Sequence, residues 1–307
     1  MNEKPRINTR GQTEAEFLMW YQSQEKNRYE EPALTVDMLI FSITDRPSTN
    51  HRKLPNKELQ VLLVRRKDHP YLGQWAIPGG FVGIHEGLET AAARELKEET
   101  GLDEVYLEQL YTWGDNVQRD PRMRVVSVSY MALVDGGSLH VEAGDDAEEA
   151  EWFTVQTEVL EKTTNSQGDR SEKVERIQWI LTGERTKLSF ILSVTSATEK
   201  TRTKTVVTPE AECELAFDHA QILHYGLERL RNKLNYTPVA FHLLPPEFSL
   251  TELQLVYETI LGRPLVKAQF RRKIAPLVVE TSQLREQYQH RPSKLFRFNP
   301  QWIVDNF

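Results

Sequence analysis

The chain has 307 residues, of which 39% are hydrophobic and 27% charged, and its formal net charge is −7. This length suffices for about two domains with cores of their own, and the composition is that of a globular protein. No apolar run is long enough for a transmembrane helix, and the polar residues 1–12 lack the apolar segment of a secretory signal. The single cysteine, Cys213, excludes an internal disulfide framework and a multi-cysteine zinc site. We therefore expect a cytoplasmic protein that does not associate with membranes.

Charge is distributed unevenly along the chain. Residues 261–297 contain nine basic and two acidic side chains, a local charge of +7, which leaves −14 for the remainder. Such asymmetry is informative about binding partners rather than about fold.

Hydrophobic periodicity and helix-breaking residues predict an ordered series of elements before residue 240. The expected elements are a helix at 13–30, strands at 35–44 and 59–66, a helix at 87–100, strands at 105–113, 123–134 and 151–155, and a helix at 215–234. Pro32 ends the first helix, and Gly101 is suited to the residue after the second. Residues 156–213 are polar with plausible strands at 176–181, 187–194 and 205–207, and we interpret them as an insertion of uncertain structure.

The segment 80–102 carries the clearest chemical pattern. On a helix, Glu95, Glu98 and Glu99 are spaced i, i+3 and i+4, so the three carboxylates project from one face. Such oxygen ligands suit Mg²⁺ or Mn²⁺, which could bridge phosphate oxygens and activate water, although a solvated charged face would have the same local sequence. The wider spacing is G-x5-E-x7-R-E-U-x-E-E-x-G-U, with U a bulky aliphatic residue. This spacing favours a functional site over a solvated charged face. Its fixed positions are filled by Gly80, Glu86, Arg94, Glu95, Leu96, Glu98, Glu99, Gly101 and Leu102.

This pattern resembles the Nudix box. The resemblance implies an α/β/α sandwich built on a mixed sheet, which binds a nucleoside diphosphate linked to another group. It makes Glu95, Glu98 and Glu99 metal ligands, with Glu98 and Glu99 in the catalytic set, while Glu86 and Arg94 support the loop and helix. Gly80 and Arg94 are also expected among the ligand-binding residues.

Further side chains are candidates for ligand binding. Arg65 and Arg66 end a strand, where guanidinium groups could meet a diphosphate or could be simply solvated. Trp75 could stack on a base or belong to the core. The loop containing Arg122 resembles the equivalent loop of ADP-ribose-binding Nudix proteins. In Nudix ADP-ribose pyrophosphatases an acidic residue before the last strand can act as general base, and Glu148 or Glu149 stands at that place.

The basic segment predicts a winged helix-turn-helix. Ser249 and Glu252 form a capping-box pattern that opens a helix to residue 261, and a second helix is expected at 266–275. Strands at 277–280 and 295–298 flank a basic hairpin tip. The alternative is a protein-interaction module with a solvated basic face. The side chains expected to contact DNA bases and phosphates are Lys267, Gln269, Arg271, Arg272, Lys273, Arg291 and Lys294.

Together the two halves resemble the Nudix-related transcriptional regulators of NAD metabolism, the NrtR family. The resemblance rests on residues 215–234, 248–265 and 270–274 beside the Nudix box. It implies a homodimeric bacterial repressor that binds duplex operator DNA and takes ADP-ribose as effector. The alternative is a Mg²⁺-dependent ADP-ribose pyrophosphatase with an accessory domain, and the complete carboxylate set leaves hydrolysis open. The expected division is an N-terminal extension (1–33), a Nudix core (34–155), the insertion (156–213), a linker helix (214–238) and the winged helix-turn-helix (239–307).

Overall fold

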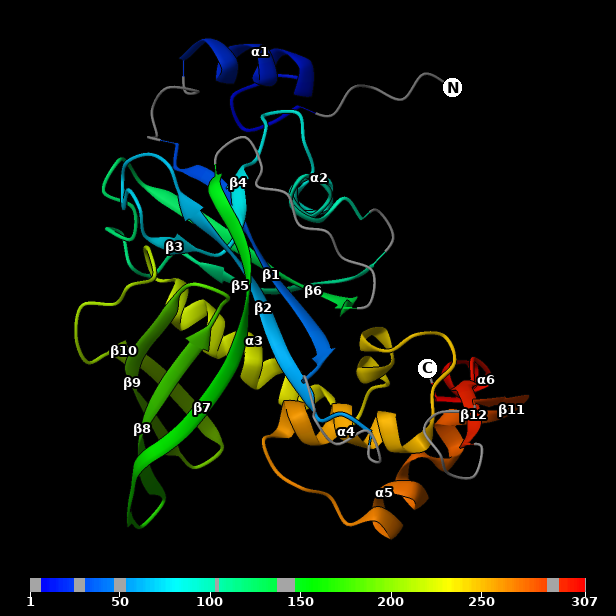
Figure 1. Ribbon diagram of the computed structural model, residues 1–307. Helices are drawn as coiled ribbons and strands as arrows, with labels where there is room; N and C mark the ends of the chain where they lie inside the picture. Colours follow the sequence, from blue (N-terminus) through cyan, green and yellow to red (C-terminus); the bar gives the residue numbers. More distant parts are fainter. Residues whose placement is uncertain are drawn as a thin grey trace, which may run out of the picture.

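The computed structural model describes residues 7–24, 31–46, 54–102, 105–136, 147–285 and 293–306 (Figure 1). The first half contains α1 (Glu14–Gln24), β1 (Ala33–Asp45), β2 (Lys57–Arg66), β3 (Trp75–Ala76), β4 (Gly79–Phe81), α2 (Leu88–Thr100), β5 (Tyr106–Trp113) and β6 (Val125–Asp135). Next come β7 (Ala147–Gln167), β8 (Arg170–Thr182), β9 (Lys187–Glu199), β10 (Arg202–Pro209) and α3 (His219–Lys233). The last part contains η3 (Val239–Leu243), α4 (Leu250–Leu261), α5 (Lys267–Ile274), η4 (Ala275–Leu277), β11 (Val278–Arg285), β12 (Ser293–Phe298) and α6 (Gln301–Asn306).

One mixed sheet runs through the larger part of the molecule. Its strand order is β10-β9-β8-β7-β2-β1-β6-β5, with β3 paired to β2 and β4 paired to β1. β1 and β6 are parallel, and the other pairs are antiparallel. The mixed sheet predicted from the sequence is thereby confirmed.

Side chains of β1 alternate between two helices because successive residues of a strand point to opposite faces. Met38 and Ile40 belong to the cluster that contains Ala92 and Leu96 of α2. Leu39 and Phe41 belong to the cluster that contains Ile222, Leu223 and Leu227 of α3. Helices α2 and α3 therefore cover opposite faces of the sheet, which is the predicted α/β/α sandwich (Figure 1).

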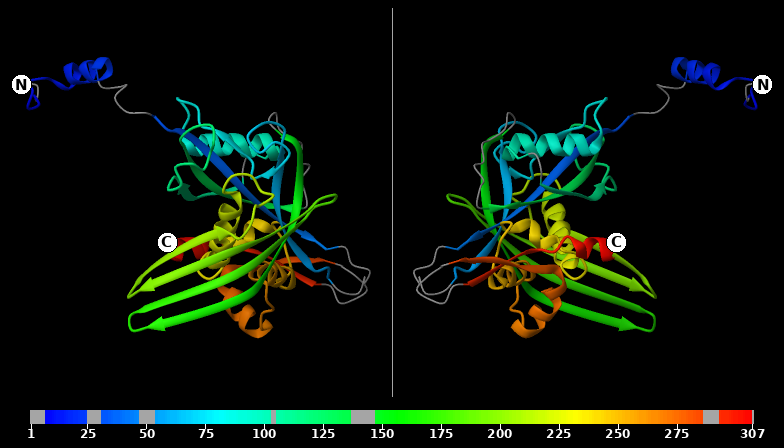
Figure 2. Two further views of the ribbon diagram at one scale, coloured as in Figure 1. Left: turned by 90° about the vertical axis from the view of Figure 1, so that its left-hand side faces the viewer. Right: turned by 90° about the vertical axis from the view of Figure 1, so that its right-hand side faces the viewer.

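The segment expected to be an insertion is a continuation of the sheet. β7 passes through the expected boundary at 155/156 without interruption, and β8, β9 and β10 add to it in succession. Figure 2 shows these strands extending together as a ribbon beyond the sandwich. Trp179 and Leu192, on its inner face, are buried in the cluster that includes α3, so the ribbon shares the core of the sandwich.

The C-terminal part has the predicted winged helix-turn-helix layout. The Ser249 side chain accepts from the Glu252 backbone, and the Glu252 side chain accepts from the Ser249 backbone, which completes the capping box. Gly262 ends α4 in the left-handed conformation. β11 and β12 then form an antiparallel wing.

Two helix boundaries differ from the expected ones. The first helix ends at Gln24, and residues 25–30 of the expected range lie outside the described part of the chain. α3 begins at His219 instead of residue 215, because Leu215 bridges to Trp75 and Phe217 has a φ of 55°, outside the helical region. Among the helices that the structure describes, none has the length and apolar character needed to cross a membrane.

Candidate functional site

Arg94 gathers the acidic side chains of the Nudix box. Its guanidinium donates to both carboxylate oxygens of Glu86, at 2.9 and 3.2 Å, and to Glu95 at 2.6 Å. It also donates to Glu98 at 3.2 Å and to the carbonyl oxygen of Phe81 at 3.3 Å. The guanidinium thus ties helix α2 to the loop before it and to β4.

Close approach between β4 and α2 depends on Gly80. A Cβ atom at this position would lie 2.3 Å from Oε1 of Glu95, so any side chain here would displace the Glu95 carboxylate. Glu95 is 7% exposed, and burial raises the pKa of its carboxyl although the Arg94 guanidinium acts in the opposite direction. The same guanidinium lowers the pKa of Glu86. The box is therefore a compact ion-paired cluster at one end of the sheet.

In this structure the carboxylates of Glu86, Glu95 and Glu98 are bonded to Arg94. In the described part of the chain, no three carboxylate, imidazole or thiolate side chains are grouped as metal ligands. Glu95 and Glu98 instead share one Arg94 nitrogen, and Glu99 is 8% exposed. The metal-ligand roles of these three glutamates stay a prediction.

Trp75 is a core residue rather than a base-stacking platform. Its side chain is 5% exposed and lies edge-on to Phe153, with 4.8 Å between ring centroids. A tryptophan at a strand end has the same sequence signature in both roles, and burial against β7 decides between them.

The other predicted ligand residues lie at the loop end of the sheet. Arg65 donates to the Gly73 carbonyl at 3.2 Å, and its guanidinium is 3.9 Å from the Glu149 carboxylate. Glu149 belongs to β7, paired with Arg65, instead of to a loop. Arg66 donates to the Pro70 carbonyl at 2.7 Å. Its guanidinium lies 5.1 Å from the ring centre of Phe217.

Arg122 lies beside the Nudix box. Its guanidinium is 5.3 Å from the ring centre of Phe81, whose carbonyl accepts from Arg94. Two hydrogen bonds, of 3.0 and 2.7 Å, hold it to the Asp120 carboxylate, and these bonds raise its pKa. The structure thus places this loop beside the Nudix box.

Sequence reasoning missed a buried polar network beneath this loop. Arg119 is 6% exposed and donates twice to Asp218, at 2.9 and 2.5 Å, and once to Asp37 at 3.3 Å. Asp37 also accepts from Ser127 at 2.6 Å. Although burial disfavours its charge, the two carboxylates raise the pKa of Arg119. The only advance signal was Asp37, a lone charge within an apolar strand.

His219 joins the same network as a neutral side chain. Burial lowers its pKa, and its Nδ1 accepts from the Ile77 backbone N–H at 2.8 Å, which requires that this nitrogen carry no proton. Its Nε2 is 3.7 Å from Asp37. Because Asp218 and His219 stand at the start of α3, the network fixes this helix end to the loop, to β1 and to the residue after β3.

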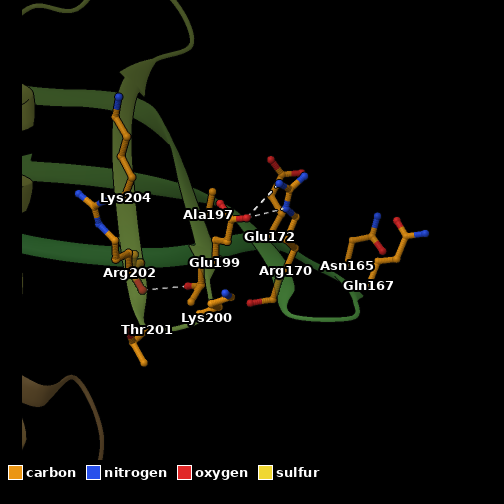
Figure 3. A pocket seen from close by; sticks show the side chains of 13 residues that line it. Asn165, Gln167, Arg170, Glu172, Ala197, Glu199, Lys200, Thr201, Arg202 and Lys204 are labelled. Atoms are coloured by element: carbon orange, nitrogen blue, oxygen red, sulfur yellow. Dashed lines mark hydrogen bonds and ion pairs between the residues drawn. The ribbon is translucent and has the colours of Figure 1, made fainter.

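A separate hollow of about 1030 Å³ lies at the far end of the ribbon, away from the Nudix box (Figure 3). It is open and lined by polar and charged side chains. Arg170 donates twice to Glu199 across it, at 3.1 and 2.9 Å. It contains none of the predicted ligand residues, which lie at the other end of the sheet, around the Nudix box.

Helix α5 presents most of its predicted DNA contacts to solvent. Lys267, Gln269, Arg271 and Arg272 are exposed, whereas Phe270 and Ile274 are buried. Two other side chains predicted to contact DNA, those of Lys273 and Lys294, are bonded to protein groups in the structure. The Lys273 ammonium donates to the Leu234 carbonyl at 3.1 Å, and that of Lys294 lies 2.6 Å from Glu280 in the wing. Arg291 lies outside the described residues.

Comparison with known families identifies a separate match for each of the two parts of the chain. The NUDIX domain model matches residues 46–174, and the model of the NrtR DNA-binding winged helix domain matches residues 240–298. A curated protein of Acinetobacter baylyi, the ADPR responsive transcriptional repressor NtrR, is 33% identical over 298 residues, which cover 96% of this chain and 92% of that protein. The chain belongs to the NrtR family.

Solved structures extend the likeness to the fold. A MutT/nudix family protein from Enterococcus faecalis matches with a TM-score of 0.65 and 29% identity, covering 94% of this chain and 95% of that one. Shewanella oneidensis NrtR complexed with a 27mer DNA matches with a TM-score of 0.53 and 28% identity, covering 87% and 94%. Both matches span the Nudix and the winged helix parts, so this family member has the two-part architecture of its relatives.

Proposed function

We propose that this chain is an ADP-ribose-responsive transcriptional repressor that binds duplex operator DNA as a homodimer. The observation that carries the proposal is the exposed basic face of α5, set in a winged helix-turn-helix and attached to a Nudix domain. The Acinetobacter relative named as an ADPR responsive repressor, similar over nearly the whole chain, supports it, as does the relative solved with DNA.

The exposed side chains of α5 have two roles in the proposed DNA binding, contact with bases and contact with phosphates. Gln269 has an amide that can form paired hydrogen bonds with adenine in the major groove. Lys267, Arg271 and Arg272 supply cations for phosphates, which position the helix without reading sequence. A dimer would present two such helices to the two halves of a symmetric operator.

Ligand control would follow from linkage. If ADP-ribose binds better to a form of the protein that fits DNA poorly, DNA affinity falls by the same factor as ligand affinity falls on DNA. Couplings of this kind typically change affinity by about 5–150-fold. Arg65, Arg66 and Arg122 are the side chains that we propose meet the diphosphate, in exchange for their present bonds to protein oxygens.

Selection of duplex DNA from a random pool, followed by fluorescence anisotropy on the selected site with and without ADP-ribose, tests this function. We expect tight sequence-specific binding that ADP-ribose releases, and two protomers per site by analytical ultracentrifugation. R271A should weaken DNA binding and leave ADP-ribose affinity unchanged, while R170A on the ribbon, the control, changes neither. Absence of specific binding in wild type would contradict the proposal.

The hydrolase alternative stays a prediction. The Nudix box is complete in sequence, and in the structure Arg94 donates to Glu95 and Glu98. Incubation of the full chain with ADP-ribose and Mg²⁺ or Mn²⁺, followed by chromatography for AMP, measures turnover. Turnover that E99Q abolishes would support the predicted metal-ligand role, and no turnover would leave the domain as a sensor.

A further inference from the structure

Helix α3 is bonded at its C-terminal end to both helices of the helix-turn-helix. Arg231, in its last turn, donates to the carbonyl of Ile260 in α4 at 3.0 Å. In return, Lys273 of α5 donates to the carbonyl of Leu234, the C-terminal cap residue of α3, at 3.1 Å. Each bond brings a cation to carbonyl groups that a helix end leaves without partners inside the helix, where the helix dipole also favours positive charge.

These cations are also held on their other sides. Arg231 donates to Glu228 within α3 at 2.9 Å and to Thr157 of β7 at 3.0 Å. The Lys273 ammonium lies 5.9 Å from the ring centre of Tyr257 in α4, and partial burial lowers its pKa. Lys273, Arg271 and Arg272 are all exposed, but among the described residues Lys273 alone of the three forms a hydrogen bond of this kind.

The N-terminal end of α3 is bonded to the ligand end of the Nudix domain. Asp218, the residue that would ordinarily cap the helix with its carboxylate, forms no such cap and instead accepts both hydrogen bonds from Arg119. Helix α3 is thus about 22 Å long. Its N-terminal end is bonded to the loop that contains Arg122, and its C-terminal end is bonded to α4 and α5.

We propose that Lys273 and Arg231 are positioning residues that fix α5 and α4, respectively, to α3, and that Lys273 is not a DNA phosphate contact. Through these bonds and the Arg119–Asp218 pair, α3 transmits ligand occupancy to α5. The parts of the proposal that concern DNA and ligand rest on the proposed function, whereas the positioning bonds themselves are tested on the free protein. A phosphate contact and a positioning bond predict different salt dependence, which allows them to be separated.

The first test measures DNA affinity against salt concentration for the full chain. Each phosphate contact contributes about 0.9 to the slope of log K against log salt. R272A should reduce the slope by about 0.9, whereas K273M should weaken affinity and leave the slope unchanged. A slope for K273M that falls as in R272A would overturn the assignment of Lys273.

The second test measures the ratio of DNA affinities without and with ADP-ribose. We expect K273M, R231Q and R119K to bring this ratio about 2- to 30-fold closer to one, because loss of a linking bond weakens coupling. R272A should lower both affinities and keep the ratio. An unchanged ratio in all three variants would refute transmission through α3. A wild-type ratio of one would refute the proposed ligand response, leaving the salt slopes to decide the role of Lys273.

Hydrogen exchange of the free protein tests the positioning bonds without DNA or ligand. K273M should speed exchange of amides in α5 and in the last turn of α3, and R272A should not. K273R, which keeps a donor of similar reach, should restore wild-type protection. Equal exchange in K273M and wild type would show that the bond positions nothing.

Discussion

At the scale of single residues, Arg94 holds together the acidic cluster of the Nudix box. Removing its guanidinium leaves Glu95 at 7% exposure without its charged partner. Hydrogen bonds to charged groups contribute about 1.5–3 kcal/mol each, so R94A should lower the free energy of unfolding by about 2–3 kcal/mol near pH 7. Urea denaturation measures this, with R170A as a control at an exposed Arg–Glu pair worth about 0–1 kcal/mol.

The pH dependence of R94A has a defined sign. Burial raises the pKa of Glu95 above its ordinary value of 4.5, and loss of Arg94 removes the group that opposes this rise. A folded state that holds the proton more tightly loses stability as pH rises above the ordinary value. Arg94 also lowers the pKa of Glu86, an effect that stabilises wild type above pH 4.5. The loss of unfolding free energy in R94A, relative to wild type, should therefore be smaller at pH 4.5 than at pH 7.5. An equal loss at both pH values would contradict the role of Arg94.

Tyr257 supplies a second test at the residue scale. Its side chain is 2% exposed, and its hydroxyl has no hydrogen-bond partner among the described residues. Burying such a group costs about 1–3 kcal/mol, so Y257F should raise the free energy of unfolding by about 1 kcal/mol at pH 8. A loss of stability in Y257F would instead reveal a partner for the hydroxyl.

The advantage of Y257F should grow at alkaline pH. Burial raises the pKa of Tyr257 to about 12, against an ordinary value of 10.0. As pH rises, Tyr257 therefore ionises in the unfolded chain before it ionises in the folded protein. By pH 11 this group alone lowers the free energy of unfolding of wild type by about 1.4 kcal/mol. Denaturation of wild type and Y257F between pH 8 and 11 measures the difference, and Y236F, at a tyrosine that is 60% exposed, should follow wild type.

At the scale of elements, α3 lies unusually close to β1 because of Gly226. A Cβ atom there would lie 1.9 Å from Cδ2 of Leu39, whose side chain is fully buried. Overpacking of this kind costs about 1–3 kcal/mol and should outweigh the helix preference of alanine. We expect G226A to destabilise the protein and to displace the helix that carries α4 and α5.

A double-mutant cycle can assign this effect to the contact. L39A alone should cost about 2–5 kcal/mol through the cavity it leaves. In L39A/G226A the new methyl group occupies part of that cavity. The double variant should therefore lose at least about 1 kcal/mol less unfolding free energy than the two single variants lose in sum. G226A combined with I274A on α5 should be additive, and additivity in both cycles would refute the contact with Leu39.

The elements that the sequence predicted well are those defined by local signals. Helix α2 follows from its apolar spacing and Gly101, and α4 from the Ser249–Glu252 capping box. The ribbon was not recognised as part of the sheet because the outer half of β7 is exposed and lacks apolar alternation. Its pairing with β8 is set by the turn at Gly168, where φ is 59°, and by contacts of α3 with the inner face.

At the scale of the whole molecule, the site combines features of very different predictability. Glu86, Arg94 and Glu95 meet because a loop and one helix bring near neighbours together, and their spacing contains that information. Arg119 and Asp218 are 99 residues apart, and only the packing of α3 on the sheet joins them. The same limit applies to Trp75 and Lys273, whose residue types suit two roles until their neighbours in space are known.

One hydrophobic cluster joins the two halves of the molecule, and this has a thermodynamic consequence. Leu63 of β2, Leu227 of α3, and Leu253 and Ile260 of α4 all belong to it, so the winged helix part has no core separate from the α3 side of the sandwich. We expect a single calorimetric unfolding transition in which calorimetric and van't Hoff enthalpies agree. L253A and L63A, each costing about 2–5 kcal/mol, should both lower this one transition by several degrees. Hydrogen exchange should show α4 and β1 losing protection together in L253A. Two transitions, or an L253A effect confined to the C-terminal helices, would mean that the parts unfold independently and that α3 does not bind them into one unit.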